Sequence, residues 1–275
     1  MISKIFRFFL ASLILLTSIF AHAASAPWPR ELNKLSSLGE LGQRVGRLVV
    51  SQQDPLLSSV MLSALRHPRV RIISLRELKH DWTDQFLAIA VVENRPFSRV
   101  HIQQVGPQQN FNDEITRNFL AKEQLNEGQF WLVLPKTSNR RNVMTVAHEL
   151  AHVYVQKFLD ERAPILVRRY PELFIGTRGE RFIMDSDVYS YITELFARFL
   201  EYAYFSQISA NVANPDQEFV DAPYLKRGDS FAQFRWKATL YLIREYEIPS
   251  TKARRWMDSP LFQDMIKHAL TTGSL

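Results

Sequence analysis

Residues 143–159 constrain the fold more than any other segment, because they are apolar on nearly every side of a helix. The apolar side chains cover the whole helical circumference: Val143, Met144, Val146, Leu150, Val153, Val155, Phe158 and Leu159. A helix that is apolar all round is normally buried, so we expect it to run through the middle of a domain. The chain has 275 residues, 46% of them hydrophobic, which is enough to surround such a helix.

The segments before and after this helix differ in kind. Residues 31–66 have helical spacing, and Asp54-Pro55 is a typical helix start. Short runs rich in Val, Ile and Phe then predict four strands, at 70–75, 86–92, 100–105 and 130–134. The remaining predicted helices are 113–124, 142–160, 186–206, 229–246 and 258–270. This order predicts an α+β fold, with a helical N-terminal extension over 27–68, a main domain over 69–275 and a helical C-terminal half.

The beginning of the chain has the pattern of a secretory signal. Lys4 and Arg7 precede an apolar run of 13 residues, which is shorter than the roughly 20 residues that span a bilayer. Small residues then stand at the spacing that a signal peptidase accepts, with Ala23 or Ala26 at the cleavage point. We expect residues 1–23 to be removed and the protein to be periplasmic or secreted, without stable membrane insertion. An uncleaved anchor is the alternative.

Composition excludes several classes of function. Lys and Arg outnumber Asp and Glu by 34 to 28, but they are scattered, and the densest groups, 139–141 and 252–255, are short. A nucleic-acid partner would favour a basic stripe with aromatic residues, so we expect none. The sequence contains no cysteine, which excludes disulfides, cysteine nucleophiles and thiolate zinc sites. A metal would therefore be held by histidines and carboxylates.

The buried helix carries a His-Glu-x-x-His motif within residues 145–154, Thr-Val-Ala-His-Glu-Leu-Ala-His-Val-Tyr. His148 and His152 are four residues apart, so both imidazoles lie on one helix face and can bind one Zn²⁺. Glu149 lies about 100° further round, where it can reach a water without being a ligand. These three polar groups cost several kcal/mol in a buried helix unless they are satisfied. A metal and its water would satisfy them; hydrogen bonds to backbone or carboxylate partners are the alternative.

The motif and its surroundings resemble the extended active-site motif of zincin metallopeptidases, from Thr145 to Tyr154. The run 130–134, Phe-Trp-Leu-Val-Leu, also resembles the edge strand that these enzymes place beside the substrate. The resemblance implies a mixed sheet with this edge strand above the active-site helix, where the strand pairs with a peptide. It also implies hydrolysis by a zinc-activated water, with Glu149 as general base.

A catalytic zinc usually has three protein ligands and an open position, so a third ligand is needed. The metzincin pattern is excluded, because Val155 and Phe158 occupy the positions of its glycine and histidine. Asp185 or Asp187 could serve as in aspzincins, but Gly176-Thr177 is not followed by the acid which that family requires. A downstream glutamate, the gluzincin arrangement, remains.

Glu194 and Glu172 are the two candidates for this glutamate. Glu194 lies in the predicted helix 186–206, on the face opposite its apolar stripe, together with small side chains that permit close helix packing. Its Glu-x-Phe-Ala string resembles the zinc-ligand helix of anthrax lethal factor-like and small gluzincin peptidases. Glu172 has 19 residues between it and His152, as in thermolysin-like enzymes, but its surroundings favour only a short helix. We choose Glu194.

Residues that support the site are predicted from position alone. Tyr191 stands one turn before Glu194 and is the predicted catalytic donor to a developing oxyanion, with Tyr189 as the alternative. Glu201 or Asp187 could accept the other N–H of a zinc-bound imidazole.

The sequence thus predicts an exported zinc metallopeptidase that acts on a peptide or protein substrate. Zn²⁺ is the expected cofactor, with His148, His152 and Glu194 as its ligands and Glu149 as the base. The alternatives are a catalytically inactive, zincin-like periplasmic binding module and a membrane-anchored scaffold.

Overall fold

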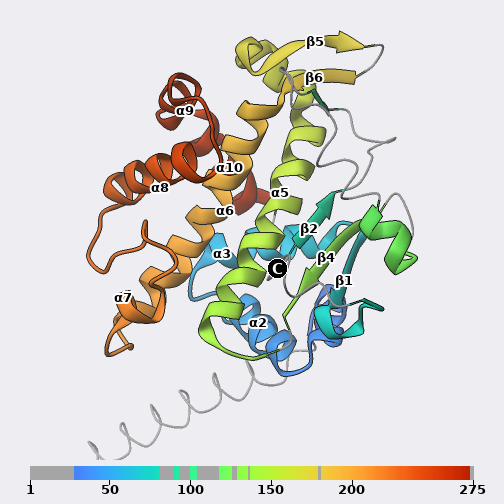
Figure 1. Cartoon of the computed structure of the whole chain (residues 1–275), viewed down its shortest axis with the longest axis vertical. Helices are drawn as coiled ribbons and strands as arrows, with labels where there is room; N and C mark the ends of the chain where they lie inside the picture. The colour runs from blue at the N-terminus through green and yellow to red at the C-terminus, as the bar shows by residue number, and fades with distance from the viewer. Residues whose placement is uncertain are drawn as a thin grey trace, which may run out of the picture.

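The computed structural model of the chain shows a mixed α+β protein that is mostly helical, with two small sheets (Figure 1). It describes residues 28–80, 89–92, 100–103, 118–125, 129–135, 137–178 and 181–272. The predicted signal peptide, residues 1–23, lies outside the described residues, as do residues 113–117 of the predicted helix 113–124. The rest of that helix is described and is helical from 118 to 123. The α+β prediction is confirmed at this level.

The central helix is α5 (Arg140–Arg169), which runs through the middle of the molecule (Figure 1). Asn139 caps its first turn by accepting a hydrogen bond from the backbone N–H of Asn142. The predicted burial of residues 143–159 is confirmed, since most of their side chains are enclosed. The helix continues beyond the predicted end at residue 160, through Pro164, because Ala163 and Leu166 still pack into the core.

The N-terminal segment forms η1 (Arg30–Leu38), α2 (Glu40–Ser51) and α3 (Pro55–Arg66). Asp54 caps α3 as expected, and accepts a hydrogen bond from the Leu57 N–H at 3.0 Å. Both α2 and α3 pack against α5, and their buried side chains belong to the same apolar core as those of α5. These helices therefore help to enclose the helix that carries the motif.

The first sheet has the strand order β1-β4-β2, made of β1 (Val70–Ser74), β4 (Phe130–Leu134) and β2 (Ile89–Val92). β4 is parallel to β1 and antiparallel to β2, so the predicted mixed sheet is confirmed. The predicted edge position of residues 130–134 is wrong, since β4 is the central strand. Its unbroken run of buried side chains, Leu132, Val133 and Leu134, is typical of a strand whose sheet is covered on both faces.

The second sheet has the order β3-β6-β5, made of β3 (Val100–Gln103), β6 (Arg181–Asp185) and β5 (Phe174–Arg178). Sequence reasoning predicted β3 but missed the antiparallel pair of β5 and β6, whose pairing is interrupted by a register shift between Phe174 and Gly176. The short helices η2 (Leu75–Glu77) and η3 (Pro171–Leu173) follow β1 and precede β5.

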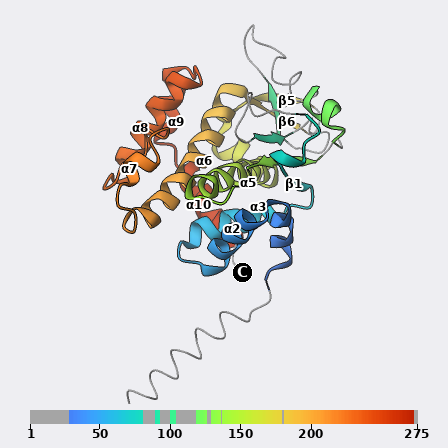
Figure 2. The same cartoon turned by 60° about the horizontal axis from the view of Figure 1, so that its bottom comes forward.

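The C-terminal half contains α6 (Ser186–Ser209), α7 (Pro215–Glu218), α8 (Phe231–Glu245), α9 (Ser250–Met257) and α10 (Leu261–Thr272). The sequence predicted all of these except α7 and α9, which are short. α8 and α9 lie on one side of the α5–α6 pair and the β1-β4-β2 sheet lies on the other (Figures 1 and 2). α10 packs against α3 and α5.

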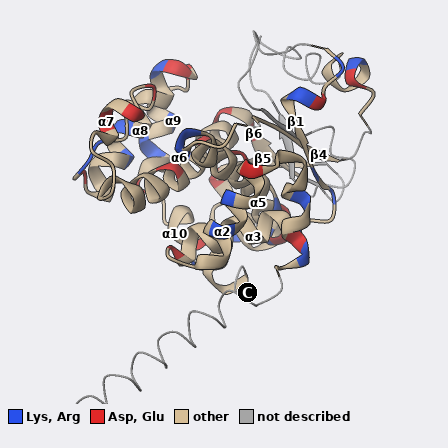
Figure 3. Cartoon of the chain, turned by 90° about the horizontal axis from the view of Figure 1, so that it is seen from below, with Lys and Arg blue, Asp and Glu red and all other residues tan. Residues whose placement is uncertain are grey.

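Two properties of the surface bear on partners. Basic and acidic residues are interspersed over the helices in the view of Figure 3. Within the described ranges, every helix is too short or too polar to cross a membrane.

Candidate metal centre

α5 and α6 pack side by side and bring three of the predicted residues together (Figure 1). His148 Nε2 lies 3.0 Å from His152 Nε2, and the Glu194 carboxylate on α6 faces both imidazoles. Glu194 Oε1 lies 3.6 Å from His152 Nε2, and Glu194 Oε2 lies 3.8 Å from His148 Nε2. The ligand atoms of these three residues all lie within 4.8 Å of one another.

The two separations between Glu194 and the imidazoles suit a shared metal ion better than direct hydrogen bonds. Zinc–nitrogen and zinc–oxygen bonds of about 2.0–2.1 Å at tetrahedral angles place donor atoms roughly 3.3 Å apart. The carboxylate contacts of 3.6 and 3.8 Å are too long for hydrogen bonds. The two Nε2 atoms at 3.0 Å need a proton or a cation between them, because two bare lone pairs would repel. The three donors could hold a metal ion, and imidazole and carboxylate are among the donor types that bind Zn²⁺ in proteins.

The outward nitrogens of both imidazoles are held by side chains of α6. His152 Nδ1 lies 2.9 Å from Thr193 Oγ1, at hydrogen-bonding distance. His148 Nδ1 lies 2.8 Å from Glu201 Oε1, an ion-pair contact whose angle departs from that of a good hydrogen bond. Partners of this kind fix the ring orientation and leave Nε2 to the metal.

The two histidines respond differently to their surroundings when no metal ion is counted. Burial lowers the pKa of His148, but the carboxylates of Glu201 and Glu194 outweigh it and raise the pKa to about 9. Burial lowers the pKa of His152 to about 4, and Glu194 offsets only part of that effect. In the metal-free protein, His148 is therefore the protonated partner and donates toward His152. A divalent cation would take the place of that proton.

Glu149 lies beside the cluster without being part of it. Glu149 is 8% exposed, and its negative charge contributes to the raised pKa of His148. The cluster is accessible from solvent, because 12–14% of the side-chain surface is exposed at His148, His152 and Glu194. Three ligand side chains on two helices, with a further carboxylate next to them, could therefore hold a metal ion.

The rejected third ligands lie elsewhere. Glu172 is exposed in η3, beyond the end of α5, and the helix from His152 to Arg169 alone spans about 25 Å. Asp185 and Asp187 lie at the start of α6, where both accept a hydrogen bond from Lys252 Nζ, at 2.7 and 2.8 Å.

The tyrosines predicted for the oxyanion are not brought to the cluster. Tyr191 is only 1% exposed, and its hydroxyl pairs with Thr239 Oγ1 on α8 at 2.9 Å. The Tyr191 hydroxyl is thus engaged in the core, and the structure gives no support to its predicted catalytic role. The Tyr189 hydroxyl donates to Gln156 Oε1 at 3.0 Å.

Sequence reasoning missed two residues of this region, Thr193 and Arg198. Thr193 contacts His152 through the helix packing, and Arg198 Nη2 lies 3.3 Å from Glu194 Oε2. The spacing of four residues between Glu194 and Arg198 is a usable signal for the second contact.

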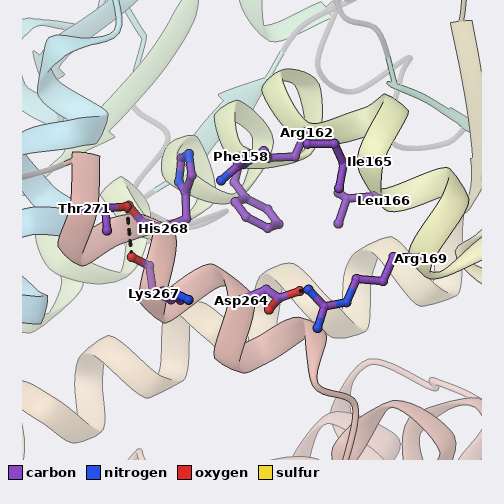
Figure 4. Close-up of a pocket in the computed structure, with 9 residues that line it drawn as sticks. All are labelled: Phe158, Arg162, Ile165, Leu166, Arg169, Asp264, Lys267, His268 and Thr271. Carbon is purple, nitrogen blue, oxygen red and sulfur yellow. Dashed lines mark hydrogen bonds and ion pairs between the residues drawn. The ribbon is translucent and has the colours of Figure 1, made fainter.

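A separate cavity of about 310 Å³ lies between the second half of α5 and α10 (Figure 4). The side chains that line it are Phe158, Arg162, Ile165, Leu166, Arg169, Asp264, Lys267, His268 and Thr271. The cluster residues are not among them, so this cavity is not the opening of the metal centre.

Comparison of the chain with protein-family models, with curated proteins and with solved structures gives no match.

Proposed function

We propose that the protein is a zinc-dependent hydrolase that cleaves peptide bonds. The observation that carries this proposal is the convergence of His148, His152 and Glu194 from two packed helices, with Glu149 adjacent on α5. The resemblance of residues 145–154 to the zincin motif supports peptide amides as the substrate class.

Each residue has a distinct role in the proposed reaction. His148, His152 and Glu194 hold the metal, and Thr193 and Glu201 orient the two imidazoles. A bound Zn²⁺ supplies Lewis acidity, which makes water acidic enough to ionise near neutral pH and polarises the scissile carbonyl. Glu149 accepts the proton of the attacking water and later delivers it to the leaving amine.

The test is the substitution Glu149→Gln. The variant should bind one zinc per chain like the wild type, because Glu149 is not a ligand, and should lose turnover of a broad peptide library. Glu161→Gln makes the same chemical change on the same helix and should leave activity intact. Undiminished cleavage by Glu149→Gln would refute the mechanism. Zinc binding without cleavage by the wild type would favour a binding module.

We further propose export, on the basis of Lys4, Arg7 and the apolar run that follows. N-terminal sequencing of the protein from the exported fraction of cells tests this: a new terminus at residue 24 or 27 supports export with cleavage, an intact terminus contradicts cleavage, and absence of the protein from that fraction contradicts export.

A further inference from the structure

Arg198 lies between the two carboxylates that α6 directs toward the metal centre. It follows Glu194 by four residues and precedes Glu201 by three, so all three lie on one side of the helix. Arg198 Nη2 is 3.3 Å from Glu194 Oε2, and Nη1 is 3.8 Å from Glu201 Oε2. Arg198 is only 6% exposed, so these contacts are largely shielded from water.

Three tyrosines surround the guanidinium group. The Arg198 Cζ atom lies 4.8 Å from the ring centre of Tyr224, 4.7 Å from that of Tyr241 and 5.5 Å from that of Tyr246. Such contacts stabilise a buried cation. Two hydroxyls add directional bonds: Nη1 donates to the Tyr224 hydroxyl at 2.6 Å, and Nη2 donates to the Tyr246 hydroxyl at 3.0 Å. The guanidinium plane is therefore fixed on several sides.

The hydroxyl of Tyr224 also donates to Glu201 Oε2. Tyr224 thus links Arg198 to the carboxylate that contacts His148 Nδ1. Arg198 and Tyr224 both contact Glu201 Oε2, while Glu201 Oε1 lies 2.8 Å from His148 Nδ1. The Glu201 carboxylate is therefore held where it can orient the imidazole.

The contact between Arg198 and Glu194 fixes the orientation of the Glu194 carboxylate. Arg198 holds Oε2, while Oε1 is the oxygen nearer to His152 Nε2, at 3.6 Å. A carboxylate without this partner could rotate and exchange its two oxygens. Arg198 therefore acts on the third ligand directly, and on His148 through Glu201.

We propose that Arg198 is a positioning residue for the metal centre, and that Tyr224 and Tyr246 hold it in place. The inference rests on the proposed function, because it assumes that the cluster binds zinc. Arg198 orients two carboxylates and does not itself bind the metal. The segment from Tyr224 to Tyr246, which includes α8, thereby helps to position the residues of the metal centre.

The experiment compares four variants of the full chain: Arg198→Lys, Tyr224→Phe, Tyr246→Phe and Tyr202→Phe. Zinc affinity is measured by competition with a chelator, the absorption spectrum of the Co²⁺-loaded protein reports ligand geometry, and urea unfolding gives the stability of the metal-free chain. Tyr202→Phe is the matched control, since its hydroxyl donates to the Asp229 carbonyl at 2.8 Å.

Arg198→Lys should weaken zinc binding about 10- to 100-fold, because an ammonium group cannot bridge both carboxylates and both hydroxyls. Tyr224→Phe and Tyr246→Phe should each weaken it roughly 3- to 10-fold and change the Co²⁺ spectrum. Tyr246 is 44% exposed, so its variant should fold normally. Tyr202→Phe should match the wild type in affinity and spectrum.

The inference is overturned if the wild type binds zinc tightly and the three network variants match it in affinity and Co²⁺ spectrum. It is also overturned if the variants lose only metal-free stability, which would show a purely structural role. A wild-type chain that binds no zinc overturns the proposed function and this inference together, so the two failures are distinguishable.

Discussion

Replacing Glu194 by Gln isolates the contribution of the third ligand. The substitution keeps the size of the side chain but removes the negative charge that faces His148 Nε2 and His152 Nε2 at 3.8 and 3.6 Å. Structural zinc sites with four ligands bind with about 10–16 kcal/mol, so one ligand contributes on the order of 3 kcal/mol. That corresponds to a zinc affinity roughly 100-fold weaker.

The assay is chelator competition on metal-stripped protein, with the free zinc concentration buffered. Glu172→Gln is the matched control, because it changes the other candidate glutamate, which is exposed in η3. Its affinity should equal that of the wild type. If Glu194→Gln binds zinc as tightly as the wild type, or if Glu172→Gln is the weaker variant, the assignment of the third ligand is wrong.

Two further predictions concern stability. A Cβ atom at Gly42 would lie 2.0 Å from the Leu35 backbone oxygen, so Gly42→Ala should lower the free energy of unfolding by about 2 kcal/mol or more. Gly176→Ala is the control, because the space around Gly176 is open and its stability should not change. Equal stability of the two variants in urea would contradict this prediction. Burial lowers the pKa of His67 and His268 to about 4, below the unfolded value of 6.5, so the unfolded chain binds more protons in this window. Stability should therefore be full above about pH 6.5 and fall toward pH 4, by about 1–2 kcal/mol for His268 after solvent screening. His268→Gln should flatten this slope in unfolding curves of the metal-free protein, and an unchanged slope would refute it.

The part of the site that depends on one helix could be predicted from the sequence. The relation between His148, Glu149 and His152 follows from helix geometry alone, and the apolar surroundings predicted the burial of α5. Glu194 could be ranked above Glu172 because its helix is strongly periodic and presents small residues where another helix must approach. Both conclusions use local patterns.

The part that depends on how helices face one another could not be predicted. Thr193 contacts His152 only because of the way α6 is rotated about its axis against α5. No local sequence pattern predicts that rotation. Tyr191 has the right spacing from Glu194, but its hydroxyl finds Thr239 on α8, a residue 48 positions later.

Strand order is a second limit of sequence reasoning. The run of β4 (Phe130–Leu134) resembled an edge strand, but β4 lies between β1 and β2, and its Leu132, Val133 and Leu134 side chains are buried. A continuous apolar strand favours a central position, and that physical rule would have corrected the analogy.

The most direct test of the central claim is the metal content of the wild-type chain, measured by mass spectrometry after purification without added metal and again after titration with zinc. We predict one zinc ion per chain, and little or none in a His148→Ala, His152→Ala double variant. A wild-type chain that carries no metal and takes up none on titration would contradict the account.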